Sequence, residues 1–105
     1  MKQYQPKEQV IQNHILQYLR LKGYYVWKNN TAGIYKQATN SYIPSHAKGV
    51  SDIIGLTKQG VFIAIEVKRR SGKLSPNQKA FLEAIRASGG IAILAYDLAD
   101  VEKIL

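Results

Sequence analysis

Apolar positions follow two different periods along this chain of 105 residues. Between Pro6 and Gly23 they recur at helical spacing, which predicts an amphipathic helix that begins near Pro6 and ends at Gly23. The apolar stripe comprises Ile11, Ile15, Tyr18, Leu19 and Leu21. The next run, 24–28, is rich in aromatic and β-branched residues and predicts a short strand.

Two apolar runs in the middle of the chain, 51–56 and 61–68, predict a β-hairpin. If residues 58–60 form a three-residue loop, Gly60 falls at the position that requires a left-handed backbone, and Thr57 pairs with Val61. In that register Asp52 lies directly across from Glu66. The segment 29–49, which precedes the hairpin, shows no helical period and is interpreted as a long loop.

The last third of the chain predicts a helix, a buried strand and a second helix. Ser75 is expected to cap the first helix with Pro76 at its first position, and Gly89-Gly90 follows it. The apolar run 91–96 predicts a buried strand, and Asp97 is expected to cap a short final helix. A strand, helix, strand crossover makes the flanking strands parallel neighbours. The predicted fold is a single α/β domain, 1–105, in the order α-β-β-β-α-β-α, with a mixed central sheet flanked by helices.

The chemistry of the hairpin centres on Asp52 and Glu66. Opposed side chains in antiparallel strands are roughly 5 Å apart, and like charges at that distance are destabilising unless a cation neutralises them. Period-two alternation places Lys68 on the same face as Glu66. The alternative is that these three charges simply form a solvated strand face.

Charge is distributed unevenly along the sequence. The net charge is +8, and residues 1–80 contain thirteen basic side chains but only three acids, Glu8, Asp52 and Glu66. Such a basic stretch fits a polyanionic partner. Seven tyrosines occur in the chain, several of them among basic residues, where a ring could stack on an unpaired base; the alternative is that they are ordinary half-buried residues.

The composition also excludes some classes of protein. Without cysteine there are no disulfides and no thiolate metal sites, which is compatible with a reducing compartment. No apolar run approaches the length of a membrane span, and no signal peptide is recognisable, so a cytoplasmic location is expected.

Several of these residues, taken in order, resemble the VRR-NUC nucleases, a branch of the PD-(D/E)xK superfamily. The resemblance rests on Gly49-Val50-Ser51-Asp52, Glu66-Val67-Lys68, Gly72-Lys73-Leu74-Ser75 and Gln78, and it covers nearly the whole chain. Ser51 stands where the superfamily motif has proline. The resemblance implies a restriction-endonuclease-like fold.

The resemblance also implies a set of site residues. Asp52, Glu66 and the backbone carbonyl of Val67 would bind Mg²⁺ or Mn²⁺, and Lys68 would act on the attacking water or the developing charge. Glu8 and Gln78 are the matching positions for a further acid and a glutamine of the site. Their alternatives are structural: Glu8 would stabilise the helix dipole, and Gln78 would form a capping box with Ser75.

The expected function is that of a metal-dependent, structure-selective endodeoxyribonuclease. Short stand-alone members of the family resemble homodimeric Holliday junction resolvases, so branched DNA and a homodimer are expected. The candidate DNA-binding residues are Lys28, Lys36, Lys48, Arg69, Arg70 and Lys73, with His46 as a weaker candidate in the loop. The alternatives are a sequence-selective or nonspecific nicking nuclease and a catalytically inactive DNA-binding module.

Overall fold

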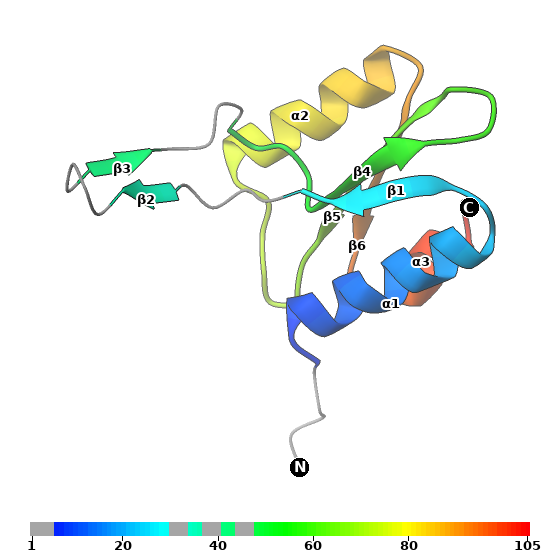
Figure 1. Ribbon diagram of the computed structural model, residues 1–105, viewed down its shortest axis with the longest axis horizontal. Coiled ribbons are helices and arrows are strands. Elements are labelled where there is room, and N and C mark those ends of the chain that lie inside the picture. Colours follow the sequence, from blue (N-terminus) through cyan, green and yellow to red (C-terminus); the bar gives the residue numbers. More distant parts are fainter. Residues whose placement is uncertain (1–5, 30–33, 37–40, 44–47) are drawn as a thin grey trace.

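A computed structural model shows a mixed four-stranded sheet covered by helices on both faces (Figure 1). It describes residues 6–29, 34–36, 41–43 and 48–105, and for 34–36 and 41–43 the backbone alone. The elements are α1 (Glu8–Leu21), β1 (Tyr25–Lys28), β2 (Ile34–Lys36), β3 (Ser41–Ile43), β4 (Ile53–Leu56), β5 (Phe62–Val67), α2 (Pro76–Ala87), β6 (Ile91–Ala95) and α3 (Leu98–Glu102).

The main sheet has the strand order β1-β4-β5-β6. β1 and β5 each run antiparallel to β4, and β6 runs parallel to β5. The sheet and its helices therefore follow the order α-β-β-β-α-β-α, which confirms the predicted fold class.

The interpretation of 29–49 as a long loop is wrong in part. This segment contains β2 and β3, which pair antiparallel as a separate two-stranded sheet (Figure 1). Each strand is only three residues long, too short for a period to be recognised, although Ile34-Tyr35 and Tyr42-Ile43 are residue types that favour strands. His46 lies outside the described residues.

α1 covers one face of the sheet. Its residues Ile15 and Leu19 are completely buried against the sheet strands and the C-terminal segment that carries α3. Burial of an aliphatic side chain of this size stabilises the fold by about 1.5–3 kcal/mol. The helix begins at Glu8, two residues later than predicted, because Pro6 precedes the extended N-cap residue Lys7. It ends as predicted, with Gly23 in the left-handed conformation at φ +90°.

The β4–β5 hairpin has the predicted register. Ile53 pairs with Ile65 and Leu56 with Phe62, and the backbone N–H of Thr57 donates to the carbonyl of Val61 at 2.9 Å. Gly60 is left-handed at φ +83°, as the three-residue loop requires.

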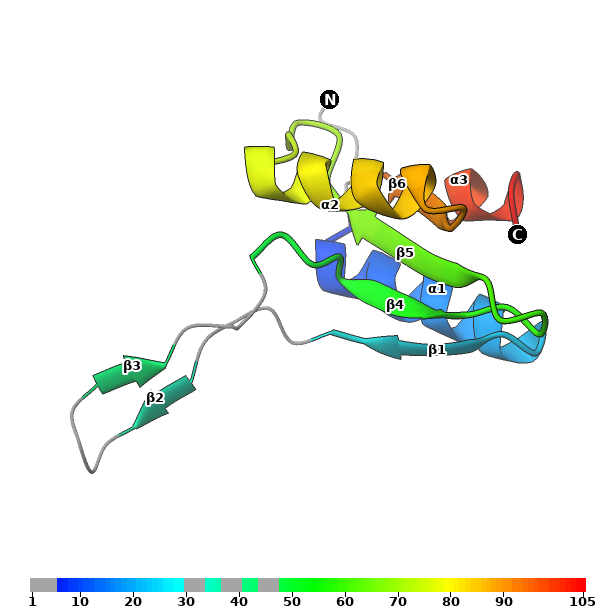
Figure 2. The same cartoon turned by 90° about the horizontal axis from the view of Figure 1, so that it is seen from above.

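α2 covers the opposite face and completes the crossover from β5 to β6. Ser75 caps it and Pro76 is its first residue, as predicted. Leu82 of α2 is buried against Ala64 of β5 and Ala92 of β6. Figure 2 shows α2 over this side of the sheet, with β1 at the far edge. Within the described residues, no helix combines the length and hydropathy needed to cross a membrane.

Gly55 allows β1 and β4 to pack closely. A Cβ atom at this position would lie 2.2 Å from the carbonyl oxygen of Tyr25 and 2.7 Å from Cα of Val26. Those atoms are backbone, so the clash cannot be relieved by rotating a side chain. The close pairing of β1 with β4 thus requires glycine at position 55.

We expect Gly55→Ala to destabilise the protein by about 3 kcal/mol, because the methyl group must push β1 away from β4. The matched control is Gly60→Ala, where an added Cβ meets no atom of the described residues within 4 Å. That variant should lose only about 1 kcal/mol, the cost of a left-handed non-glycine residue. Urea unfolding measures both, and equal losses would contradict the packing argument.

Candidate nuclease site

Asp52 and Glu66 meet at the end of the β4–β5 hairpin. The register continues one pair beyond Ile53 and Ile65, which brings Asp52 beside Glu66. The Asp52 carboxylate accepts a hydrogen bond from the backbone N–H of Val67 at 2.9 Å, and its own carbonyl accepts one from Asn29 at 2.7 Å. Asp52 therefore links the ends of β1, β4 and β5.

Glu66 is a buried acid with one oxygen left without a partner. Its side chain is 2% exposed, and Oε1 accepts a hydrogen bond from Nε2 of Gln78 at 3.0 Å. Oε2 is buried and has no hydrogen-bond partner among the residues that the structure describes. A buried carboxylate oxygen without a partner is costly, so this atom indicates a missing proton or cation.

Burial is the main cause of an unusual pKa at Glu66. The pKa is raised from 4.5 to about 8: desolvation contributes most, the negative charge of Asp52 acts in the same direction, and the Lys68 ammonium opposes the shift. A proton on Glu66 would also let the side chain donate a hydrogen bond to Asp52, which favours the protonated form. Without a cation, the pair therefore holds one proton near neutral pH.

Gln78 has both of the roles considered for it from the sequence. Its Oε1 accepts a hydrogen bond from the backbone N–H of Ser75 at 2.9 Å, and its backbone N–H donates to the Ser75 hydroxyl at 3.1 Å. The capping box is therefore present, and it orients the amide so that Nε2 points at Glu66. The capping hydrogen bonds with Ser75 therefore hold the Gln78 side chain where it can also bond to Glu66.

Gly49 brings the segment before Asp52 against the first turn of α2. A Cβ atom here would lie 2.3 Å from the carbonyl oxygen of Asn77 and 2.8 Å from the backbone nitrogen of Gln78, and Gly49 is left-handed at φ +81°. Any larger residue would move Asp52 relative to Gln78. This contact was not predicted from the sequence, although Gly49 belongs to the motif that carries the resemblance.

Lys68 and Val67 follow Glu66 at the end of β5. Val67 is buried in the core that faces α1, and Lys68 is half-buried, with its backbone N–H donating to the carbonyl of Ala95 at 3.0 Å. Gly72 lies beside the Lys68 side chain, so that a Cβ there would be 3.5 Å from Cδ. The turn after β5 thus packs along the aliphatic part of Lys68.

Glu8, on α1, also lies near the C-terminal end of β5. From the first turn of α1, its Oε1 accepts a hydrogen bond of 3.4 Å from the backbone N–H of Arg69. The structure places Glu8 near the C-terminal end of β5 and does not group it with the acid pair. Throughout the described ranges, no three His, Asp or Glu side chains are close enough to share a metal ion.

The candidate DNA-binding residues surround this end of the sheet. Lys28 ends β1, Lys48 precedes Gly49, and Arg69, Arg70 and Lys73 lie in the turn between β5 and α2; all five side chains are exposed. Arg70 forms an ion pair of 3.6 Å with Asp97, which is worth little at such an exposed position. The backbone of Lys36 is in β2, and its side chain lies outside the described structure.

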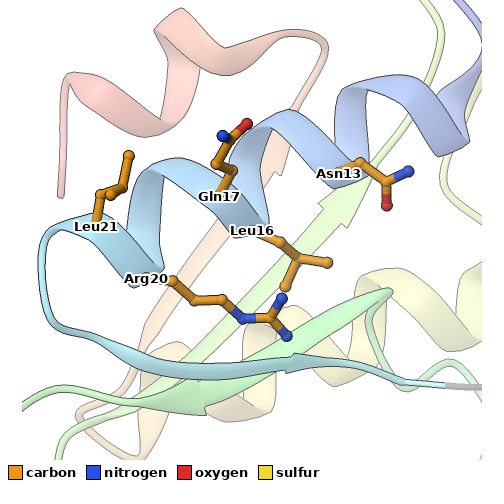
Figure 3. Close-up of a pocket in the computed structure, with 5 residues that line it drawn as sticks. All are labelled: Asn13, Leu16, Gln17, Arg20 and Leu21. Atoms are coloured by element: carbon orange, nitrogen blue, oxygen red, sulfur yellow. The ribbon is translucent and has the colours of Figure 1, made fainter.

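Two surface hollows lie away from the acid pair. The first has a volume of about 440 Å³ and is lined by five residues of α1: Asn13, Leu16, Gln17, Arg20 and Leu21 (Figure 3). Arg20 reaches across to donate a hydrogen bond to the carbonyl of Val26 at 3.4 Å. The second, of about 230 Å³, is lined by Lys22, Gly23, Tyr24, Lys58 and Gln59. Neither contains an acidic residue, so neither has the groups that metal-assisted hydrolysis needs.

The residues at the acid pair fit a hard divalent cation. Two carboxylates supply oxygen donors, and the unpartnered Oε2 of Glu66 is in place to accept one more charge-neutralising partner. Mg²⁺ prefers such oxygen ligands and retains several waters, so it requires few protein groups.

Comparison with known proteins supports the fold and identifies a family. The sequence model of the VRR-NUC domain matches residues 3–97. Two solved structures described as "VRR_NUC domain" and "VRR_NUC domain protein" share the fold, at TM-scores of 0.66 and 0.67 and identities of 20% and 16%. The first alignment covers 92% of this chain and 91% of the other, and the second 96% and 86%. No curated protein matches the sequence.

A mixed sheet with an Asp, a Glu and a Lys at the end of its central hairpin agrees with a nuclease domain of the PD-(D/E)xK type, the class that the matched family model implies. The match over residues 3–97 is more specific. The chain belongs to the VRR-NUC domain family.

Glu66 should make the stability of the metal-free protein depend on pH. Its folded-state pKa of about 8 exceeds the ordinary value of 4.5, so the folded protein binds the proton more tightly than the unfolded chain. This stabilisation is complete below pH 4.5 and is lost as the pH rises towards 8.

The measurement is urea unfolding across this range in chelator. Glu66→Gln should remove the contribution, whereas Glu83→Gln, at an exposed position on α2, should leave the wild-type profile unchanged. Identical profiles for wild type and Glu66→Gln would show that the acid pair does not hold a proton.

Proposed function

We propose that this chain, as one domain over residues 1–105, is a metal-dependent endodeoxyribonuclease that hydrolyses phosphodiester bonds of branched DNA. The observation that carries the proposal is the acid pair, in which the buried Glu66 keeps an unpartnered oxygen beside the half-buried Asp52. Two opposed carboxylates require a proton or a cation to offset their repulsion, and a bound cation would serve phosphodiester hydrolysis. Membership of a nuclease family supports the same conclusion.

Asp52, Glu66 and the backbone carbonyl of Val67 would hold Mg²⁺ or Mn²⁺. When bound, the cation supplies positive charge for the anionic transition state and polarises the oxygens of phosphate and water. Glu8 would act at a greater distance, because it contacts the backbone of Arg69 and could orient a water at the edge of the site. The hydrogen bond from Gln78 keeps the Glu66 carboxylate turned towards Asp52.

Lys68 would supply the remaining charge. Its ammonium lies near enough to Glu66 to oppose the rise in the pKa of that acid. An ammonium at this position can hold the attacking water by hydrogen bonding and neutralise charge that develops on the phosphate. Packing of the turn at Gly72 along its stem restricts where the ammonium can go.

Exposed basic residues around the acid pair would bind the DNA backbone. Lys28 and Lys48 flank the segment that leads to Asp52, and Arg69, Arg70 and Lys73 follow Lys68. We place Lys36 in the same set on its position in β2. These groups contact phosphates and so supply affinity without reading the sequence of bases.

We propose branched DNA as the substrate on the resemblance to short VRR-NUC nucleases, which resemble Holliday junction resolvases. Symmetric cleavage of a four-way junction requires two sites related by a two-fold axis, and one chain supplies one site. We therefore propose a homodimer. A nonspecific nicking nuclease is the second candidate.

Substitution of the acids should separate binding from cleavage. Asp52→Ala and Glu66→Ala should reduce cleavage to background while DNA binding is retained or tightened, because removing a carboxylate lessens the repulsion of phosphate. Lys68→Ala should slow turnover by about 10²–10⁴-fold and keep the affinity for metal, since it removes a group that acts on the water.

Cleavage of labelled DNA with Mg²⁺, Mn²⁺ or EDTA, and calorimetry with metal alone, give these quantities. Glu83→Ala, on the exposed face of α2, is the matched acid control and should cleave normally. Full activity in EDTA, or in either acid variant, would rule out the proposal. Loss of metal binding in Lys68→Ala would contradict its assigned role.

A further prediction of the proposed function concerns the DNA substrate and the oligomeric state. Light scattering should give about twice the mass of one chain, which is 11.8 kDa. Labelled four-way junctions should be cleaved in preference to linear duplex of the same sequence. A monomer that nicks linear duplex equally well would leave the nuclease assignment in place and favour the nonspecific nicking enzyme.

A further inference from the structure

Three apolar side chains are exposed together on β1 and β4. Tyr25 is 72% exposed, Trp27 40% and Leu56 38%. Tyr25 and Leu56 are paired across the two strands, and the rings of Tyr25 and Trp27 form an edge-to-face pair with centroids 5.6 Å apart. We call these three residues, two aromatic and one aliphatic, the aromatic face.

The aromatic face is on the same side of the sheet as Glu66. Period-two alternation along β1 turns Val26 into the core against α1, so Tyr25 and Trp27 point to the other side, where α2 lies. α2 packs on β5 and β6 (Figure 2), and β1 forms the far edge of the sheet. The helix therefore covers the half of this side that includes Glu66 and leaves the aromatic half exposed.

The aromatic face also lies close to the acid pair. Trp27 pairs with Ile54, and two residues further along both strands come Asn29 and Asp52, whose backbones are hydrogen-bonded at 2.7 Å. Strand geometry gives roughly 8 Å between the Cα atoms of Trp27 and Asp52, from a rise of about 3.4 Å per residue and a strand spacing of about 4.8 Å. A nucleotide adjoining the cleaved phosphate can span such a distance.

Charge around the aromatic face favours a polyanion over a second copy of the chain. Lys58 is exposed in the turn between β4 and β5, beyond Leu56. Between Glu8 and Asp52 the sequence contains no acidic residue. A two-fold dimer through this face would place this acid-free, basic segment of both copies at the interface, which is unfavourable, whereas a nucleic acid supplies the opposite charge.

We infer that Tyr25 and Trp27 are a stacking platform for an unpaired base next to the phosphate that the acid pair hydrolyses. The inference rests on the proposed nuclease function and adds the form of the substrate. An edge-to-face pair leaves ring surface open to a base, and stacking does not distinguish among bases because each has a π face. A fully paired duplex cannot offer such a base, so the platform selects DNA with unpaired nucleotides at the cut, as at a flap or junction.

Trp27 is the only tryptophan in the chain and reports on stacking directly. Its fluorescence should be quenched when the protein, in EDTA, is titrated with oligothymidylate of about ten nucleotides. An abasic strand of equal length, which carries the phosphates without bases, and a blunt duplex should both quench weakly at saturation. Equal quenching by the abasic strand would overturn the inference, since phosphate contact alone would then explain the signal.

Variants separate stacking from apolar contact. Trp27→Leu should weaken binding of oligothymidylate on the order of tenfold, and Trp27→Phe should retain most of the affinity, because only the second keeps an aromatic ring. Ile104→Ala, an exposed apolar residue outside this face, is the control. Tyr25→Leu provides a second test, in which the Trp27 signal remains and binding should again weaken. Wild-type affinity in both Leu variants would overturn the inference.

The stacking platform and the proposed nuclease function can be refuted separately. If Asp52→Ala cleaves normally, the nuclease mechanism fails, while quenching by unpaired bases would still establish the platform. If Trp27→Leu cleaves branched and linear DNA as wild type does, the platform fails and the nuclease stands. A dimer that dissociates on Trp27→Leu substitution, with no quenching by DNA in the wild type, would assign the face to self-association and overturn the inference.

Discussion

The close approach of Asp52 to Glu66 is the constraint that organises the rest of the structure. Two carboxylates roughly 5 Å apart repel each other by about 3 kcal/mol at an effective dielectric constant near 20. The fold offsets part of this cost with the Val67 N–H bond to Asp52 and the Gln78 amide bond to Glu66. It leaves one Glu66 oxygen unpartnered, which a proton or a cation can satisfy.

Each of these partners comes from a different part of the chain, and backbone packing holds them together. The hairpin register sets Asp52 against Glu66, and the capping box of α2 aims the Gln78 amide. Gly49 then brings the segment before Asp52 into contact with the backbone at Asn77 and Gln78. The geometry of the pair is thus coupled to the start of α2, so a substitution at Gly49 would disturb the site without removing a charged group.

Coverage of the sheet by α2 divides one face into two regions with different properties. In the half over β5 and β6, burial and the neighbouring Asp52 raise the pKa of Glu66 to about 8, and the half over β1 exposes two aromatic rings. Hydrolysis needs the first region, because electrostatic interactions strengthen where water is excluded. Recognition of an unpaired base needs the second, since stacking requires an accessible ring. A wider helix layer would have covered both.

Local chemistry was enough to predict much of this protein from its sequence. Gly60 after a polar turn determined the hairpin register, and with it the opposition of Asp52 and Glu66; Ser75 and Pro76 determined where α2 begins. Three features required the tertiary structure, because they depend on elements that are distant in sequence. These are the contact of Gly49 with α2, the position of Glu8 beside Arg69, and the exposure of Tyr25 and Trp27. Period two could place Tyr25 and Trp27 on one side of β1, but only the packing of α2 decided that this side would stay uncovered.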